Sequence, residues 1–169
     1  MIVETNKHPP LEDGAIFSDD RQCRFVLWRH INPIGREVVF IMLNPSSAGA
    51  YRDDPTVKKC MKYAWKWGYG RLKVLNVYPH ISTDPRLLNR DLGRAQNLFY
   101  FDQLRQTNLL KDADKIVCAW GKHAKKADTD EVLRRIRSHP SICALYKNLD
   151  GSPSHPLYLP GYIDPVAFP

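Results

Sequence analysis

The sequence has no run of apolar residues long enough for a membrane-spanning helix, so we expect no membrane partner. Its first residues, MIVETNKHPPLEDG, are polar and lack the apolar core of a signal peptide, which favours a cytoplasmic protein. The four cysteines form no CxxC pair, so a zinc knuckle is excluded and reduced core thiols are expected. The chain also lacks a Walker loop and a GxGxxG loop, and no third acidic ligand accompanies Asp53 and Asp54, so we expect neither a cofactor nor a metal.

What the sequence does contain is typical of one globular domain, with 169 residues of which 43% are hydrophobic. Residues 1–20 are predicted to be a flexible N-terminal arm, and residues 21–169 a single α/β domain with a proline-rich C-terminal wrap. The net charge of +7 and the pI of about 9.3 favour a polyanionic partner such as DNA or a nucleotide. Many small basic proteins bind no nucleic acid, so charge alone does not decide the partner.

Apolar runs alternate with amphipathic segments along the chain. The predicted strands are Arg24–Arg29, Glu37–Leu43, Arg71–Val77, Asp114–Trp120 and Ile142–Tyr146. The predicted helices are Pro55–Trp67, Arg94–Leu110 and a third from Gly121 to about Ser138. This alternation predicts a three-layer αβα domain with a mainly parallel central sheet of about four to five strands. Right-handed crossovers would then gather the strand-to-helix loops at one edge of the sheet.

The segment FIMLNPSSAG brings an asparagine to that edge. The amide of Asn44 both donates and accepts, so it can read a base edge or hold a water molecule without charge. Pro45 fixes the backbone after it, and Ser46 and Ser47 keep the loop slim enough for a flat ligand. Asn44 is equally well explained as a structural cap of the strand.

The same loop continues with aromatic and charged residues. Tyr51 can stack on a base and Arg52 can meet a phosphate. Either Asp53 or Asp54 can orient a water molecule or stabilise positive charge on a sugar, although helix capping is the expected role of Asp54, which precedes Pro55.

Further candidates come from the later loops. His155, between prolines, can donate to a leaving group or a phosphate, or can be an ordinary surface histidine. Gly121 and Lys122 are expected to offer backbone amides and charge to an anion at the start of the third helix. Tyr78 closes a strand at the same edge and is taken as a further binding residue.

Two resemblances follow from these segments. Four segments of the chain together resemble domain of unknown function 1643. They are RFVLWRHINP, the long stretch from VVFIMLNPSSAG to RLKVLNVYP, DKIVCAWGKHA and SHPLYLP. The chain also has a more distant resemblance to motifs of the uracil-DNA glycosylase superfamily, in Met42–Ser46, in the strand ending in Gly121-Lys122 and in His155–Leu157. In the first of these motifs, Met42 and Ser46 stand in place of glycines.

The second resemblance implies a glycosylase-like fold and a role for three catalytic residues. Asn44 would read a flipped base or position a water molecule, Asp53 would stabilise a sugar cation, and His155 would contact the leaving base. The resulting hypothesis is a DNA N-glycosylase-like enzyme acting on a modified nucleobase. The alternatives are a non-catalytic nucleic-acid-binding module and an enzyme acting on free nucleosides or nucleotides.

Overall fold

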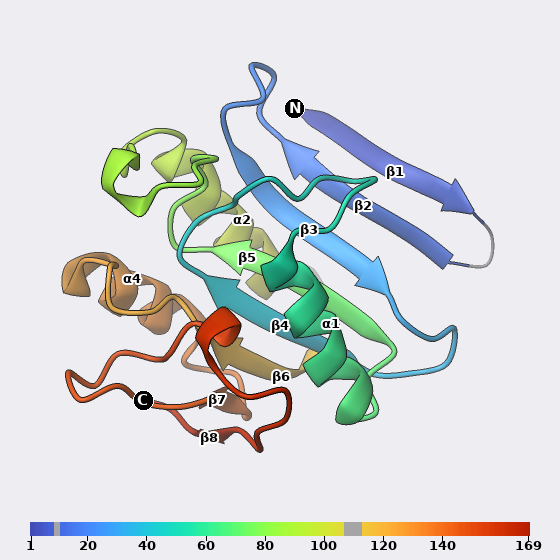
Figure 1. The fold of residues 1–169 in the computed structure, drawn as a ribbon. Coiled ribbons are helices and arrows are strands. Elements are labelled where there is room, and N and C mark those ends of the chain that lie inside the picture. Colours follow the sequence, from blue (N-terminus) through green and yellow to red (C-terminus); the bar gives the residue numbers. More distant parts are fainter. Residues whose placement is uncertain (9–10, 107–112) are drawn as a thin grey trace.

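The computed structural model describes residues 1–8, 11–106 and 113–169 of the chain (Figure 1). Its elements in chain order are β1 (Ile2–His8), β2 (Leu11–Phe17), β3 (Arg24–His30), β4 (Glu37–Met42), α1 (Pro55–Lys66), β5 (Arg71–Asn76), η1 (Pro85–Leu87), α2 (Arg94–Gln106), β6 (Ala113–Cys118), α4 (Lys126–Ile136), β7 (Ile142–Ala144), η2 (Pro156–Tyr158) and β8 (Val166–Ala167).

The strands form one mixed sheet in the order β1-β2-β3-β5-β4-β6-β7-β8. Strands β5, β4, β6 and β7 are parallel neighbours, whereas the pairings β1–β2, β2–β3, β3–β5 and β7–β8 are antiparallel. The prediction of a mainly parallel, glycosylase-like sheet of four to five strands in three layers is therefore wrong. Continuous apolar runs identify strands that are buried on both faces, and the added antiparallel strands at the two edges lack such runs.

The largest departure is at the N-terminus, where the segment predicted as a flexible arm forms the β1–β2 hairpin. Side-chain packing stabilises this hairpin in addition to its backbone hydrogen bonds, since Ala15 and Phe17 of β2 are buried in the hydrophobic core. Gly14 lies under the indole of Trp28, and a β-carbon at this position would come within 2.2 Å of that ring. The close approach requires glycine, because any side chain would push β2 away from β3.

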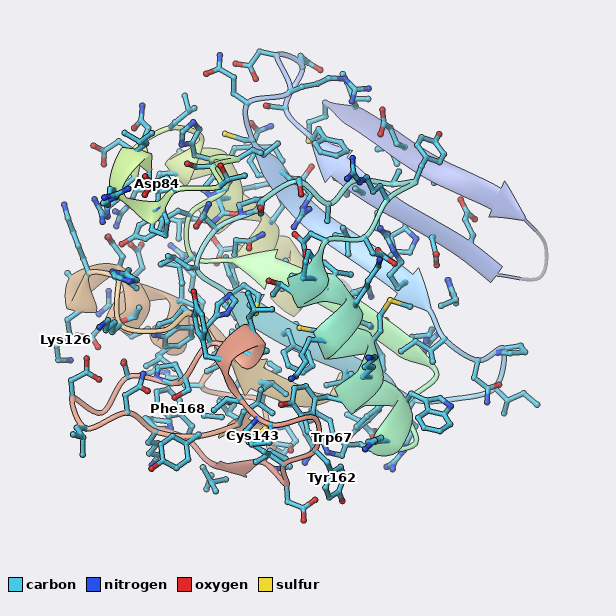
Figure 2. The ribbon with its side chains drawn as sticks, viewed as in Figure 1. Trp67, Asp84, Lys126, Cys143, Tyr162 and Phe168 are labelled. Carbon is cyan, nitrogen blue, oxygen red and sulfur yellow. The ribbon has the colours of Figure 1, made fainter. Side chains whose placement is uncertain are left out.

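Apolar side chains cover both faces of the sheet. On one face, α1 buries Val57, Cys60, Tyr63 and Ala64 against Val38, Phe40, Leu72 and Val74. On the other, Phe101 of α2 and Val132 and Ile136 of α4 pack against Val39, Ile41, Leu75 and Ile116. Figure 2 labels Trp67, the residue after α1, whose ring stacks on that of Phe40 with the two ring centroids 6.1 Å apart. In the described part of the chain, no helix has the length and apolar character needed to cross a membrane.

The proline-rich C-terminal segment lies against α1 before it returns to the sheet as β8. Nζ of Lys59 donates to the carbonyl of Leu159 at 2.7 Å, and the hydroxyl of Tyr63 donates to the carbonyl of Pro160 at 2.5 Å. Both donors belong to α1, so this helix positions the segment that carries His155.

Candidate functional site

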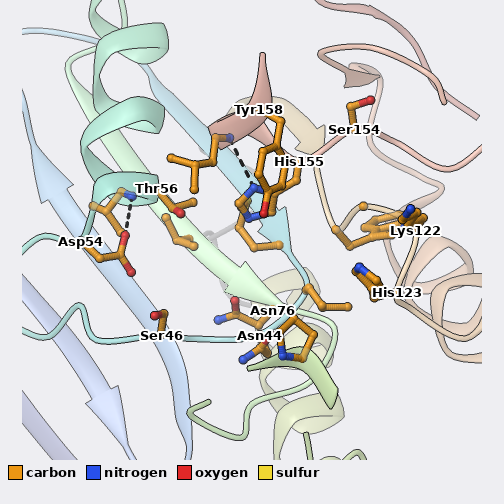
Figure 3. A pocket seen from close by; sticks show the side chains of 18 of the residues that line it. Asn44, Ser46, Asp54, Thr56, Asn76, Lys122, His123, Ser154, His155 and Tyr158 are labelled. Carbon is orange, nitrogen blue, oxygen red and sulfur yellow. Dashed lines mark hydrogen bonds between the residues drawn. The ribbon is translucent and has the colours of Figure 1, made fainter. Parts of the chain in front are cut away.

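The chain reverses its direction of travel across the sheet at β4. Strand β4 is followed by α1 on one face and then by its neighbour β5, whereas α2 leads along the opposite face to β6 on the other side of β4. Loops that leave the carboxyl ends of β4 and β6 therefore diverge, and ligands of open α/β sheets bind in the crevice that such a divergence creates. A pocket of about 600 Å³ lies at this place (Figure 3).

Most polar residues of the pocket come from the ends of the parallel strands, the start of α1 and the C-terminal segment. The polar lining consists of Arg24, Asn44, Ser46, Asp54, Thr56, Asn76, Ser82, Thr83, Lys122, His123, Asn148, Ser154 and His155. The volume falls within the range of roughly 300–1,000 Å³ that is common for small-molecule sites.

Asn44 has a fixed orientation in this pocket. Its Nδ2 donates to the carbonyl of Pro45 at 2.9 Å and to the carbonyl of Ser82 at 2.8 Å. Both amide hydrogens are thus used, and Oδ1 is left as an acceptor for a donor on the ligand. The amide of Ser82 also donates to the carbonyl of Pro45, at 3.0 Å, so Pro45 joins the loops after β4 and β5 and does not itself line the pocket.

Asn76, the last residue of β5, lies beside Asn44 on the pocket wall (Figure 3). Only 1% of its surface is exposed, and neither Nδ2 nor Oδ1 has a hydrogen-bond partner among the residues that the structure describes. A buried amide without partners costs about 1–3 kcal/mol, so native proteins rarely keep one without a reason. The amide therefore has a free donor and a free acceptor where a ligand can satisfy both.

Asp54 caps α1 and also lines the pocket. Its Oδ1 accepts from the backbone amide of Val57 at 2.8 Å, and Pro55 occupies the first position of the helix. No donor within the described ranges is bonded to its Oδ2, so that oxygen remains available to the pocket. The sequence expectation that Asp54 caps the helix is confirmed. Of the two carboxylates that the sequence offered for the site, Asp54 is the one that lines the pocket.

His155 enters the pocket from the C-terminal segment. Its Nδ1 accepts from the backbone amide of Leu157 at 3.3 Å, which makes it the cap of η2. The neutral ring then carries its proton on Nε2. Burial lowers the pKa of His155, while the carboxylate of Asp54 acts in the opposite direction. At neutral pH His155 is therefore an uncharged hydrogen-bond donor in the same pocket as Asn44.

Asp53, predicted to be catalytic, does not line the pocket. Its Oδ1 accepts from Nε of Arg29 at 2.8 Å, and the guanidinium of Arg29 is buried between this carboxylate and that of Asp13 at 3.8 Å. Asp53 therefore has a structural role, because its carboxylate pairs with Arg29 of β3, which is distant in the sequence.

The predicted binding residues Ser47, Tyr51 and Arg52 lie in a second, shallower groove of about 330 Å³, and Ser46 lines both. Tyr51 is 69% exposed, and its hydroxyl donates to the carbonyl of Thr5 at 3.4 Å. These residues are not brought together with His155.

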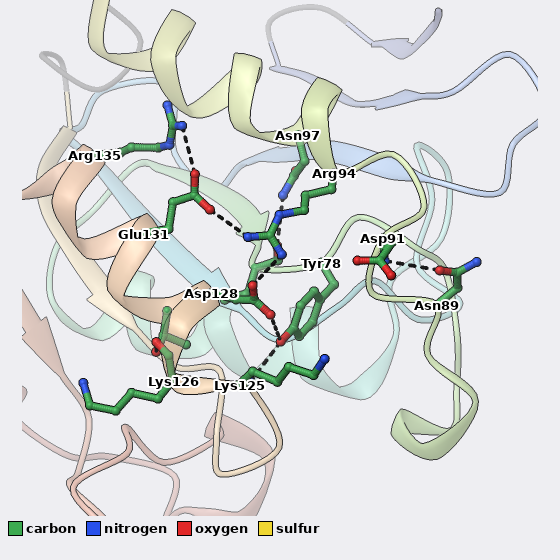
Figure 4. Close-up of polar contacts among 12 residues, drawn as sticks. Tyr78, Asn89, Asp91, Arg94, Asn97, Lys125, Lys126, Asp128, Glu131 and Arg135 are labelled. Carbon is green, nitrogen blue, oxygen red and sulfur yellow. Dashed lines mark hydrogen bonds and ion pairs between the residues drawn. The ribbon is translucent and has the colours of Figure 1, made fainter.

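Tyr78, also predicted to bind substrate, is a buried structural residue (Figure 4). Its hydroxyl donates to Oδ2 of Asp128 at 2.8 Å and accepts from the backbone amide of Lys125 at 3.0 Å. Burial raises the pKa of Tyr78, and the hydrogen bond to Asp128 raises it further. Tyr78 thus fixes the start of α4, and it does not line the pocket.

Gly121 and Lys122 both line the pocket, but they do not form the predicted helix N-terminus. The third helix begins only at Lys126, and the amide of Gly121 donates to the carbonyl of Pro153 at 2.9 Å. Because that amide is already bonded, the predicted anion site on the backbone of Gly121 is wrong. Through this hydrogen bond the segment after β6 is attached to the backbone just before His155.

Arg24 and Asn76 are the pocket residues that the sequence reasoning missed most clearly. Asn76 follows the apolar run RLKVL in the same way that Asn44 follows FIML, and the register pairs Asn76 with Met42. Two asparagines at the ends of neighbouring apolar strands were a readable signal. No comparable signal marked Arg24, whose side chain reaches the pocket only because β3 pairs with β5.

Among the residues that the structure describes, no group of three or more histidine, cysteine, aspartate or glutamate side chains is placed to hold a metal ion. No curated protein and no solved structure matches the chain, and the resemblance to the glycosylase superfamily is therefore not supported by a known structure. The family model described as "Protein of unknown function (DUF1643)" matches residues 24–157, which include every strand of the parallel group and the pocket residues from Arg24 to Leu157. The chain therefore belongs to the DUF1643 family.

Proposed function

We propose that this protein is an enzyme that binds a nucleobase, carried by a nucleotide or by DNA, in the pocket and cleaves the bond between the base and its sugar. The observation that carries the proposal is the buried amide of Asn76, which has no partner in the described part of the chain and lies beside the fixed acceptor of Asn44. A nucleobase presents donors and acceptors in one plane, and side-chain amides match such edges.

Two further groups support chemistry at the glycosidic bond. The free Oδ2 of Asp54 can take a proton from a water molecule whose oxygen attacks the sugar carbon. The carbon–nitrogen bond breaks with its electron pair going to the base, and Nε2–H of His155 stabilises the departing anion by donating a hydrogen bond to it. The base then takes up a proton from solvent. Asp54 returns its proton to solvent, so the products are the free base and the hydroxylated sugar, and His155 keeps its Nε2 proton throughout.

The motif resemblance of Met42–Ser46 and His155–Leu157 supports the same class of substrate. The basic net charge of +7 also favours a phosphate-bearing partner over a neutral one. The charge is equally compatible with a nucleic-acid-binding module that lacks turnover, and the experiment below separates the two functions.

The test is to incubate the protein with nucleosides, nucleotides and oligonucleotides that carry normal or modified bases, and to detect released bases by mass spectrometry. We expect release with at least one substrate, and loss of release in Asp54→Asn, which keeps a capping oxygen but removes the charge. Asp130→Asn is the matched control, because Asp130 is a surface carboxylate paired with Lys126 on α4.

Binding of a ligand without release of base by the wild type would favour the non-catalytic module. Neither binding nor release across the whole panel would overturn the proposal.

A further inference from the structure

Arg24, the first residue of β3, places a buried positive charge in the pocket wall. Only 2% of its surface is exposed, and its backbone amide donates to the carbonyl of Pro79 at 2.9 Å. Its Nη1 donates to the carbonyl of Ala48 at 2.5 Å, so the side chain reaches the loop that follows Asn44.

The guanidinium of Arg24 has more donors than partners. It offers five N–H groups, of which the bond to Ala48 is the one found within the described residues, and Nε is buried with no partner there. No carboxylate of the described part lies within 4.0 Å of it, although Asp54 lines the same pocket. Burial lowers the pKa of Arg24 to about 10, Asp54 opposes this change and Arg29 adds to it, so the group is still charged at neutral pH.

Arg29, five positions further along β3, provides a direct comparison. It is also 2% exposed, but its guanidinium bonds to Asp53, to the carbonyls of Trp28 and Gly49, and lies near Asp13. Arg29 is thus neutralised by nearby carboxylates, whereas Arg24 has no carboxylate within 4.0 Å among the described residues. Burying a charge whose hydrogen-bond donors are not all used costs free energy, and Nε of Arg24 has no partner within the described residues, so its retention at a pocket wall points to an anion that binds there.

We propose that Arg24 binds an oxyanion of the ligand, and this inference rests on the proposed function. The oxyanion is a phosphate ester of the nucleoside whose base contacts Asn44 and Asn76. The hydroxyls of Ser46 and Thr56 line the same pocket and can donate to the phosphate oxygens, and Lys122 adds a second positive charge to the lining. The two cations offset the repulsion between a phosphate and the carboxylate of Asp54. The pocket would therefore select a nucleotide over the corresponding nucleoside.

Calorimetry compares the wild type with a nucleoside, its 5′-monophosphate and a short single-stranded oligonucleotide that contains the same residue. Charge-assisted hydrogen bonds predict that the phosphorylated ligands bind roughly 10- to 100-fold more tightly than the nucleoside. Tightest binding of the monophosphate would identify a free nucleotide, and tightest binding of the oligonucleotide would identify an internal phosphodiester. Equal affinities for the nucleoside and both phosphorylated ligands would overturn the inference and leave the proposed function standing.

Variants then attribute the preference to Arg24. Arg24→Met keeps much of the side-chain length without the charge, and it should remove the preference while leaving nucleoside affinity within about threefold. Arg86→Met is the control, since Arg86 is a fully exposed arginine that pairs with Asp84 on η1. Persistence of the full preference in a folded Arg24→Met protein would overturn the inference.

Inorganic phosphate supplies a readout that does not depend on base recognition. Phosphate should raise the melting temperature of the wild type more than chloride at equal ionic strength, and it should lose this advantage in Arg24→Met. If no nucleoside binds but this difference is observed, the oxyanion site stands and the proposed function fails. If phosphate and chloride act alike on the wild type, the oxyanion site is contradicted.

Discussion

Nε of Arg29 donates a hydrogen bond of 2.8 Å to the carboxylate of Asp53, and this ion pair anchors the loop that carries Asn44. The same guanidinium bonds to the carbonyl of Gly49 at 2.5 Å, so two points of the loop are attached to β3. The neighbouring Asp54 is free of this arrangement and lines the pocket. Adjacent carboxylates therefore have separate roles, one in holding the loop and one in the site.

Replacing Asp53 with alanine should destabilise the protein without removing a catalytic group. Arg29 would keep only the more distant Asp13 as a carboxylate partner, at 3.8 Å, and we expect a loss of about 1–3 kcal/mol in the free energy of unfolding. Urea denaturation measures the change. An unchanged stability combined with complete loss of base release would return Asp53 to the catalytic role that the sequence predicted.

Substitutions at Asp54 should separate its capping role from its charge. Asp54→Ala removes the acceptor for the amide of Val57 and should cost about 1 kcal/mol, whereas Asp54→Asn keeps an acceptor and should cost only a few tenths. Both variants should lose turnover, because both lack the carboxylate. Equal stability of the two variants would show that the cap contributes nothing to α1.

The stability of the protein should depend on pH through His155. Because burial lowers its pKa below the ordinary value of about 6.5, the folded state binds fewer protons than the unfolded state in this range. The contribution is fully present above pH of about 6.5 and is lost as the pH falls through the lowered pKa of the folded state. Urea midpoints measured over a pH series test this expectation.

His155→Asn is the matched variant for that series, since the amide oxygen of asparagine can replace Nδ1 as the acceptor for Leu157. It should weaken the pH dependence relative to the wild type while the C-terminal segment remains in place. Identical pH profiles of the two proteins would contradict a buried, neutral His155.

The central part of the fold and some of the residues that line the pocket were predictable from the sequence. The apolar runs that became β4 and β5 and the amphipathic α1 were found because burial on both faces, or on one helical face, leaves a direct pattern. Asn44 and His155 were expected at one edge of the sheet, because the ends of parallel strands meet there, and both residues line the pocket.

What could not be predicted depends on contacts between distant segments. The apolar residues of the β1–β2 hairpin stand in short groups of one to three and form no continuous run. The hairpin is stabilised by pairing with β3 and by the contact between Gly14 and Trp28. The choice between Asp53 and Asp54 was decided by Arg29, which no local pattern links to that loop. Tyr78 was misjudged for the same reason, because its partner Asp128 lies on α4.

Tyr78→Phe tests the structural role of that tyrosine. The change removes the acceptor for the amide of Lys125 and a donor to Asp128, both in a buried setting, so we expect a loss of about 1–3 kcal/mol. Ligand affinity should stay close to that of the wild type, since Tyr78 does not line the pocket. A stable variant with weakened ligand binding would instead support the binding role predicted from sequence.

Asn76 provides the sharpest separation between stability and function. Its amide has no partner in the part of the chain that the structure describes, so Asn76→Leu removes a desolvation cost and keeps a similar volume. We expect the free energy of unfolding to rise by about 1 kcal/mol while nucleotide binding is lost, as is common where a binding site is kept at the expense of stability.

Asn97→Leu is the control for this substitution, because Asn97 is equally buried at 1% exposure but its Nδ2 donates to the carbonyls of Asn76 and Val77 at 3.0 and 3.1 Å. Its replacement leaves those carbonyls without their donor and should lower the free energy of unfolding by about 1–3 kcal/mol. Denaturation and calorimetry on both variants measure the contrast. If Asn76→Leu lowers the free energy of unfolding as much as Asn97→Leu does, the amide of Asn76 is hydrogen-bonded within the folded protein and is not available to a ligand.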